Sequence, residues 1–450
     1  MLKAFRQGRL FLYPHMQATL NQPRTLRAWC MYDWANSVYA LVIKSTIFPI
    51  YYNNATIAYH GSDMINFFGA EIKNSVLYSW ALSCSFLIVA LIIPLLSGIA
   101  DYKGTKKRFM QFFTLMGGIC CLGLFFFDGG NVEYGIIMSI LASIGYTGSI
   151  VFYNAFLPEI ASADRYDQLS ARGFSLGYAG GLVLLIANLV LVSNPHWFGL
   201  SKGVAARMAF LMVGVWWIGF AQYSFWILPS GKRTGGSLRE NITKGYRELR
   251  KVWGELGHLR SMRFFLLSFF FFSMGIQTVM YLATMFGKKE LLLEDQKLIM
   301  TILILQFVAI IGSYLFAWLS TRYGNRASLY IQLVIWLGIC FSAAFLVYTD
   351  LDFYILASAV GLVMGGLQSL SRSSFSKLIP SNTEDYASYF SFYDVSEKIA
   401  LVLGTFSYGL VEQLTDNMRN SVLVLGIYFL IGMVFLWWVV FPKNREKLAV

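Results

Sequence analysis

The chain has 450 residues, of which 57% are hydrophobic and only 13% are charged. A soluble globular protein carries about 25% charged residues, and the mean hydropathy here is +0.56, so the composition excludes an ordinary water-soluble protein. The formal net charge of +12 comes from basic residues beside the apolar runs, which is typical of a membrane surface and gives no reason to expect a nucleic-acid partner.

Apolar runs of 18 or more residues, each long enough to cross a bilayer, recur along the whole chain. They predict an all-α integral membrane protein with twelve transmembrane helices. We expect these helices near residues 31–52, 75–99, 109–127, 134–156, 173–193, 206–228, 264–286, 298–320, 328–348, 352–376, 388–411 and 421–441.

The predicted helices divide the chain into five parts. These are an N-terminal tail (1–30), a six-helix bundle (31–228), a basic linker (229–263), a second six-helix bundle (264–441) and a C-terminal tail (442–450). Most Lys and Arg residues fall in loops on the side of the two termini, so the positive-inside bias predicts that both termini are cytoplasmic. We expect a monomer in the plasma (inner) membrane.

The linker 229–263 holds nine Lys and Arg residues, the largest basic cluster in the chain. Apolar residues recur in it at helical intervals opposite basic ones. The apolar set is Leu238, Ile242, Leu249 and Trp253, and the basic set is Arg239, Lys244, Arg247 and Lys251. This pattern predicts an amphipathic helix, which either lies on anionic lipid headgroups or forms a solvated connection.

The two bundles echo each other in sequence. A turn with Asp101, Gly104 and Lys106 follows the second predicted helix, and a turn with Arg322, Gly324 and Arg326 follows the eighth, offset by 220 residues from Gly104 to Gly324. Leu157-Pro158 and Ile379-Pro380 repeat at an offset of 222. These markers predict two pseudo-symmetric halves around a site near the middle of the membrane.

The turn around Asp101 resembles the signature loop of the major facilitator superfamily, which lies between the second and third helices of that fold. The resemblance implies that Asp101, Gly104, Lys106, Arg322, Gly324 and Arg326 steady the packing of the halves and do not bind substrate. Physically, a tight Gly turn lets Asp101 meet a neighbouring helix N-terminus while the cations face lipid headgroups.

A narrower set of motifs resembles the autophagy-related vacuolar amino-acid effluxer family and its bacterial relatives. The motifs are Tyr32-Asp33-Trp34-Ala35-Asn36-Ser37, Leu157-Pro158-Glu159, Arg172-Gly173 with Gly177-Tyr178, and Gln368-x-x-Ser371-Arg372-Ser373. Membership would imply movement of amino acids across a membrane.

Lys44 falls near the middle of the first predicted helix, where an ionisable side chain costs several kcal/mol unless it is paired or wetted. Asp33, Asn36, Ser37 and Lys44 share one face of that helix, so this polar stripe must face the protein interior. Lys44 either binds a carboxylate of the substrate or pins two helices together through a permanent pair.

Three further charges, Asp394, Glu397 and Lys398, fall in the predicted helix 388–411. The two acids are possible partners for Lys44, and a buried carboxylate beside a lysine can exchange a proton near neutral pH. Glu397 is therefore the first candidate for coupling and Asp394 the second. The alternative is a salt-bridge gate; Asp33 and Arg372 complete the predicted set of coupling or gating residues.

Other predicted helices carry polar stripes that would line the same interior. Together with the first helix, they predict a substrate site made of Lys44, Asn36, Ser37, Tyr146, Gln277, Tyr281 and Gln368. A Gly173, Gly177 and Gly181 ridge, and Gly361 with Gly365, predict close helix packing.

The motifs leave little room for catalysis. The chain has no G-x-x-x-x-G-K-[ST] phosphate loop, none of its four His residues lies in an apolar run, and its five Cys residues lack metal-site spacing. We therefore expect no enzyme activity, no cofactor and no metal. The sequence predicts a secondary active transporter of a small zwitterion or anion, driven by a proton or sodium gradient; the alternative is a receptor or scaffold with the same fold that moves no solute.

Overall fold

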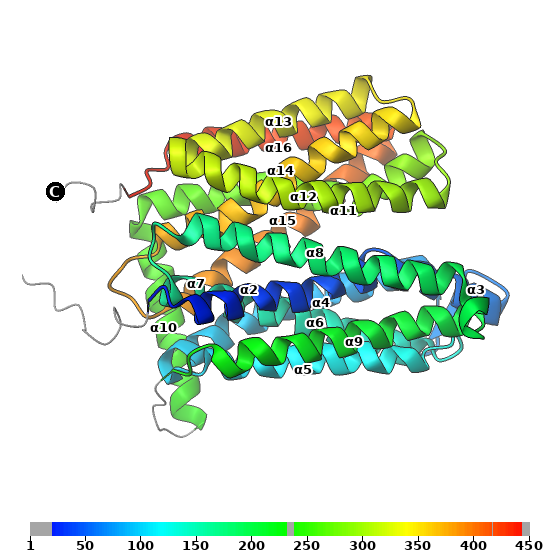
Figure 1. The fold of residues 1–450 in the computed structure, drawn as a ribbon, viewed down its shortest axis with the longest axis horizontal. Helices are drawn as coiled ribbons and strands as arrows, with labels where there is room; N and C mark the ends of the chain where they lie inside the picture. The colour runs from blue at the N-terminus through cyan, green and yellow to red at the C-terminus, as the bar shows by residue number, and fades with distance from the viewer. Residues whose placement is uncertain (1–19, 232–237, 416, 443–450) are drawn as a thin grey trace, which may run out of the picture.

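The computed structural model describes residues 20–231, 238–415 and 417–442, without the side chains of residues 238–242, 281, 282, 284 and 295. Long helices dominate it (Figure 1). The first half contains α2 (Pro23–Val38), the π-helix η1 (Tyr39–Lys44), α3 (Ile47–His60), α4 (Asn74–Lys103), α5 (Lys106–Gly123), α6 (Val132–Asn154), α8 (Tyr166–Ser193) and α9 (Lys202–Ile227), with the short elements β1 (Met64–Phe67), β2 (Ala70–Lys73), η2 (Leu124–Phe126), α7 (Leu157–Ile160) and η3 (Pro195–Phe198).

The second half follows the linker helix α10 (Leu238–His258). It contains α11 (Arg260–Glu290), α12 (Asp295–Tyr323), α13 (Asn325–Phe345), α14 (Asp350–Leu378), α15 (Tyr386–Thr415) and α16 (Met418–Trp437).

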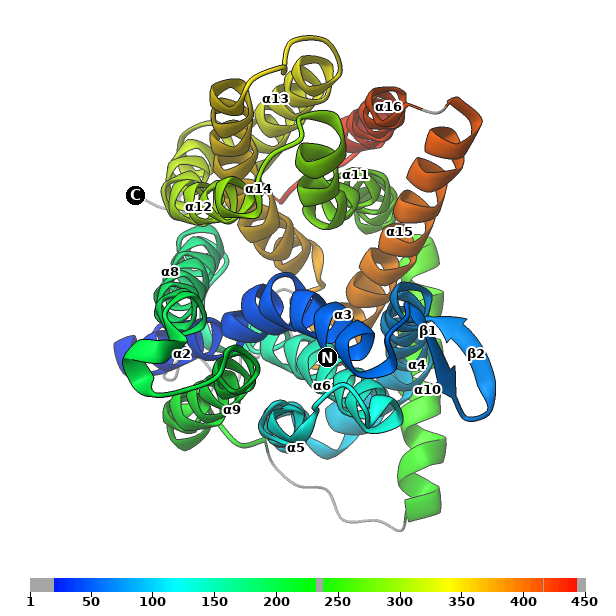
Figure 2. The same ribbon diagram turned by 90° about the vertical axis from the view of Figure 1, so that its right-hand side faces the viewer.

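Ten helices of the described chain are long and apolar enough to cross a membrane. The segment α2–η1–α3, which is interrupted, and α15, which carries charges, bring the long helical segments to twelve. The prediction of an all-α membrane protein with two six-helix halves is therefore confirmed. Seen along the bundle, the halves lie on opposite sides of a central axis (Figure 2).

The bundle has two distinct ends. At one end the described chain begins and finishes and α10 runs across the long helices; we call it the terminal end (Figure 1). At the other end, the hairpin end, α3 leads into β1 and β2, which pair antiparallel with Met64 opposite Lys73.

The first transmembrane segment is not the single helix that the sequence predicts. It begins at Pro23, ahead of the predicted start at residue 31, because proline fits the first turn of a helix. At η1 the backbone leaves the α-helical pattern, and hydroxyl groups bond to carbonyl oxygens there: Ser45 Oγ donates to the Ala40 oxygen at 2.9 Å, and Thr46 donates to Leu41 and Val42. Lys44 is the last residue of this break.

The predicted glycine ridges pack helices within each half. A Cβ on Gly173 would overlap the Asp33 carboxylate, and one on Gly177 would overlap the Ser37 hydroxyl, so α8 lies tightly along α2. In the second half, a Cβ on Gly365 would overlap the Ala309 carbonyl oxygen, which brings α14 against α12 in the same way. These contacts confirm the predicted close packing of helices.

Several helices continue beyond their predicted ends at the terminal end. For example, α8 begins at Tyr166, where residue 173 was predicted, and α4 continues to Lys103. The added turns are polar and therefore escape a search for apolar windows, yet they carry the contacts between the two halves.

Candidate functional site

A cavity of about 540 Å³ lies between the two halves. Its lining includes eleven of the residues predicted for binding, coupling or gating: Asp33, Asn36, Ser37, Lys44, Tyr146, Gln277, Gln368, Arg372, Asp394, Glu397 and Lys398. The twelfth, Tyr281, lies on α11, but its side chain is outside the described residues. The structure thus brings the predicted residues into one chamber, and their roles remain predictions.

The cavity extends toward the hairpin end. Its lining reaches Leu298 and Phe353, which belong to the first turns of α12 and α14 at that end. In the opposite direction it stops at Asp33 and Arg372, and polar contacts between the halves fill the space beyond them. The conformation is therefore closed at the terminal end.

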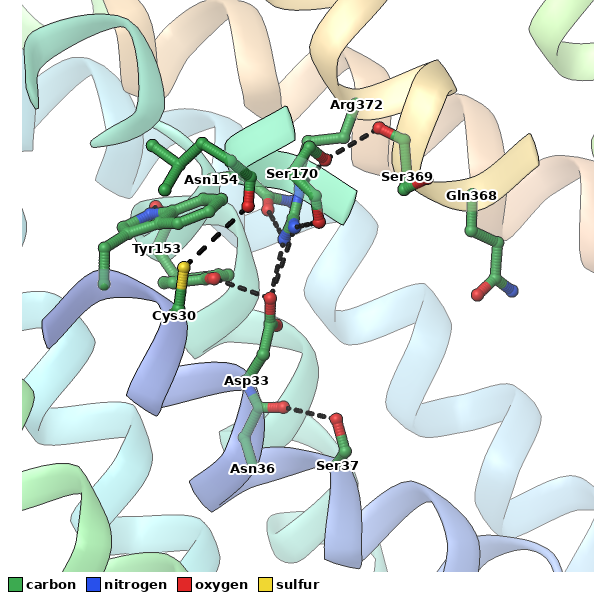
Figure 3. Close-up of polar contacts among 12 residues, drawn as sticks. Cys30, Asp33, Asn36, Ser37, Tyr153, Asn154, Ser170, Gln368, Ser369 and Arg372 are labelled. Atoms are coloured by element: carbon green, nitrogen blue, oxygen red, sulfur yellow. Dashed lines mark hydrogen bonds and ion pairs between the residues drawn. The ribbon is translucent and has the colours of Figure 1, made fainter. Parts of the chain in front are cut away.

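An ion pair between Asp33 and Arg372 forms the floor of the cavity (Figure 3). Asp33 lies on α2 in the first half and Arg372 on α14 in the second, and both guanidinium Nη atoms are 3.2 Å from Asp33 Oδ2. The Tyr153 hydroxyl donates to the same oxygen at 2.6 Å. With 7% and 3% of their surfaces exposed, neither charge can be satisfied by bulk water, so each depends on the other half.

The first half provides a pocket that fits the guanidinium group of Arg372. Nε donates to Ser170 Oγ at 2.9 Å, and Nη2 donates to the Ser170 carbonyl oxygen at 3.0 Å. Asn154 Oδ1 accepts from Nη1 at 3.3 Å. The ring centres of Trp29 and Phe174 lie 4.6 and 4.2 Å from the guanidinium carbon of Arg372. A planar cation that stacks and donates in several directions suits arginine better than lysine.

Asp101 makes a second contact between the halves. Its carboxylate accepts from the backbone N–H groups of Ala387 and Ser388, at 3.1 and 2.7 Å, and from the Ser388 hydroxyl at 2.7 Å. These groups belong to the first turn of α15, where unpaired N–H groups and the helix dipole favour an anion. Gly104, at φ +63°, makes the predicted tight turn. The expected geometry of an acid at a helix N-terminus is therefore present.

Lys106 supports this contact from the first half. Its Nζ is 3.5 Å from Asp101 Oδ1 and also pairs with Glu159. It lies 5.3 Å from the ring centre of Tyr386, the first residue of α15. Lys106 therefore lies inside the interface between the halves, whereas the sequence analysis expected it to face lipid headgroups.

Asp167 makes a third contact, which the sequence analysis did not identify. It lies in the first turn of α8 and accepts from Lys377 Nζ at 2.6 Å, Asn325 Nδ2 at 2.9 Å and Ser320 Oγ at 2.9 Å, all in the second half. Asp167 was missed because it falls between predicted helices. A signal was present, since Lys377 lies two residues before the Ile379-Pro380 marker and Asp167 follows the Leu157-Pro158 marker in the same predicted loop.

The second copy of the turn differs from the first. Gly324, at φ +87°, joins α12 to α13. Arg326 lies 5.0 Å from the Trp437 ring centre, and Arg322 lies 5.8 Å from that of Trp318. The two arginines thus lie against aromatic rings, and Asn325 provides the contact with the other half.

The charges predicted on the eleventh helix form a compact group on α15. Lys398 Nζ is 3.2 Å from Asp394 Oδ1 and 2.8 Å from Glu397 Oε2, and Gln277 on α11 donates to Glu397 Oε1 at 2.8 Å. Lys398 therefore pairs with both acids, and Lys44 lies near enough to interact electrostatically with Asp394 and Glu397. Asp394 Oδ2 is buried and has no hydrogen-bond partner, so this carboxylate retains an unused acceptor.

Lys44 lines the cavity from the first half, and its Nζ lies 4.9 Å from the ring centre of Phe86. The buried Asn36 side chain on the same face has an amide nitrogen without a partner. At the closed side, the Tyr178 hydroxyl donates to Gln368 Oε1 at 2.7 Å across the halves. The chamber thus offers unused donor and acceptor groups and charges of both signs.

Comparisons with known proteins agree with this geometry. The family model described as "Vacuole effluxer Atg22 like" matches residues 21–449. The chain belongs to this family. It is 30% identical to the MFS-type transporter YxiO of Bacillus subtilis over 92% of this chain and 94% of that protein. It is 25% identical to autophagy-related protein 22 of Saccharomyces cerevisiae (strain S288c), with 88% of each chain covered.

Solved structures of the major facilitator superfamily share the fold of this Atg22-like protein. The E. coli fucose:proton symporter FucP has a TM-score of 0.68 and 14% identity, covering 93% of this chain and 98% of that chain. The proton:xylose symporter XylE has a TM-score of 0.68 and 13% identity, covering 95% and 97%. The family match and the 30% identical MFS-type relative, together with this shared fold, make the chain a membrane transporter of the major facilitator type and not an enzyme, as the sequence predicts.

The Asp33–Arg372 pair makes a testable contribution to stability. We expect Asp33→Asn or Arg372→Gln alone to lower the thermal unfolding temperature in detergent strongly, because an unpaired buried charge costs about 3–5 kcal/mol. The double variant should be less destabilised than either single variant. Asp63→Asn, which removes an exposed partner of Lys73, is the control and should change little. Additive effects of the two substitutions would contradict a direct pair.

Proposed function

We propose that this Atg22-like protein is a secondary active transporter that moves a small solute by alternating access. The observation that supports this most directly is the polar cavity between the halves, sealed at the terminal end by contacts that all join one half to the other. Separating these contacts would expose the same chamber to the opposite side of the membrane. Such rocking of one repeat against the other around a fixed central site is how transporters built from internal repeats work.

The favoured substrate is an amino acid or a similar zwitterion or anion. Lys44 and Asn36 on the first half offer a cation and a hydrogen-bond donor, which suit a carboxylate. Asp394 on the second half has a buried carboxylate oxygen without a partner, which suits an ammonium group. A ligand that used both groups would bridge the two halves. The description of the family as an effluxer supports movement of a solute out of a compartment.

We propose Glu397 as the coupling residue, with Asp394 as the second candidate. Glu397 is less deeply buried than Asp394, with 25% of its side chain exposed against 5%, so an ion can reach it from the cavity. Binding of a proton would remove one of the two negative charges beside Lys398 and would weaken the hydrogen bond that Glu397 accepts from Gln277. Sodium would use the same carboxylate oxygen atoms, so either ion can provide the coupling.

We propose that the terminal end is cytoplasmic, which makes the present conformation outward-open. The support is the concentration of Lys and Arg in the loops at this end, in the linker above all. A plasma-membrane location and a monomeric state are proposed with it. The three aspartate contacts would then be the inner gate, with Asp101, Gly104 and Lys106 as its conformational loop.

Removal of the Lys44 amine should weaken substrate binding. A thermal-shift screen of the purified protein against L-amino acids first identifies the ligand that stabilises it most. In proteoliposomes, we expect Lys44→Ala to lower uptake of that amino acid by about 10- to 100-fold, since a hydrogen bond to a charged group contributes about 1.5–3 kcal/mol. Lys289→Ala, which removes an exposed lysine paired with Glu412, should transport normally. Unchanged uptake by Lys44→Ala would exclude the proposed site.

Replacement of Glu397 by glutamine should separate binding from coupling. We expect Glu397→Gln to exchange labelled for unlabelled substrate across the membrane but to lose accumulation under an imposed proton or sodium gradient, because the amide cannot change its charge. Glu412→Gln on the same helix is the control and should retain accumulation. Full gradient-driven accumulation by Glu397→Gln would move the coupling role to another residue.

A further inference from the structure

Helix α10 runs across the terminal end of the bundle in both views, whereas the spanning helices run along its length (Figures 1 and 2). A helix that crosses the end of a membrane bundle in this way follows the membrane surface. Its position among the lipids depends on what its two faces contact.

The inner face of α10 lies against the last turns of α4. A Cβ on Gly245 would come within 2.8 Å of the Ile99 backbone nitrogen, so the two backbones are in close contact. Val252 and Leu256 are buried on the same face. Since α4 ends at Lys103, only one turn beyond this contact, α10 lies where a spanning helix leaves the apolar layer. That level is occupied by lipid headgroups.

The acidic residues of α10 whose side chains are described, Glu248 and Glu255, both have partners within the protein. The Tyr389 hydroxyl donates to Glu255 at 2.5 Å, and Glu248 lies 3.6 Å from Lys251. Lys251 Nζ in turn donates to Asp385 at 2.7 Å, and this hydrogen bond raises the pKa of Lys251 and keeps it charged. These contacts use the acidic groups for binding α15 and its preceding loop, and leave no described carboxylate on the outer face.

The exposed outer face of α10 carries basic side chains, and aromatic ones lie along its edge, where the Trp253 ring is 5.5 Å from that of Phe392 on α15. Arg247 and Arg250 are exposed and form no ion pair with any described residue. Tyr246 and Trp253 are 59% and 67% exposed, and the spacing 246, 250 and 253 puts them on one side of the helix. Tyrosine and tryptophan are enriched at the level of the headgroups, and arginine binds phosphate oxygens in a two-pronged geometry.

We propose that this outer face binds an anionic phospholipid, with Arg247 and Arg250 on the headgroup and with Tyr246 and Trp253 beside the start of its acyl chains. The charge is complementary, and the aromatic residues have no role in holding a soluble anion. The same helix contacts Tyr102 on α4 and Tyr389 on α15, through Lys244 and Glu255. The bound lipid therefore rests on an element that joins the two halves at their closed end.

Native mass spectrometry of the full-length protein in neutral detergent tests this binding. We expect the first phosphatidylglycerol to bind more tightly than the first phosphatidylcholine. The variant Arg247→Gln/Arg250→Gln should weaken phosphatidylglycerol binding roughly 25-fold, since each basic residue near a headgroup contributes about a fivefold factor. Arg108→Gln, which changes an exposed arginine at the start of α5, should bind as the wild type does.

A second measurement locates the lipid. The fluorescence of Trp253 is obtained by subtracting the emission of the Trp253→Phe variant from that of the wild type. In vesicles containing brominated phosphatidylglycerol, this fluorescence should be quenched. In the Arg247→Gln/Arg250→Gln variant, the quenching should be lost. Equal affinity for the two lipids, unchanged binding by the double variant, or an unquenched Trp253 would each overturn the proposal. Because lipid binding is the readout, the result is independent of whether the transport proposal holds.

Discussion

A carboxylate taken out of water must find its counter-charge or its hydrogen-bond donors inside the protein. In this transporter three aspartates of the first half, Asp33, Asp101 and Asp167, meet that requirement with groups of the second half. Their partners differ: an arginine, a helix N-terminus and a lysine with an amide. All three contacts lie at the terminal end or at the floor of the cavity, so polar contacts hold the closed end of the molecule. When these contacts separate, water can hydrogen-bond to the groups that they release.

This constraint accounts for the arrangement around it. Packing within each half is tight, as the overlaps that a Cβ on Gly177 or Gly365 would cause indicate, so each half can move as one body. The interface between halves is polar, and the cavity above it contains charges of both signs. Rigid halves joined by a polar interface favour a two-state rearrangement over gradual deformation. The family membership and the fold agree with such a transporter.

Much of this could be predicted from the sequence because the membrane restricts the possible folds. Apolar windows located the spans, and the high cost of charge in lipid directed Lys44, Asp394 and Glu397 toward one interior chamber. Two features could not be read in this way. The contacts of Asp167 depend on helical turns too polar for an apolar window, and the pairing of both α15 acids with Lys398 depends on side-chain geometry within one helix. The break at η1, by contrast, has a sequence marker, because Pro49 cannot complete a helical hydrogen bond to the Ser45 carbonyl oxygen.

The central claim, that the three aspartates hold the terminal end closed, is tested most directly by a distance between the halves at that end. Spin labels are attached to Asp164→Cys and Asn382→Cys, both exposed loop positions, in a background where the exposed Cys84 is replaced by Ser. Double electron–electron resonance then measures the distance between the two labels. The wild type should give one short-distance population, and the triple variant Asp33→Asn/Asp101→Asn/Asp167→Asn should gain a longer one. The same distance distribution in both proteins would contradict the account.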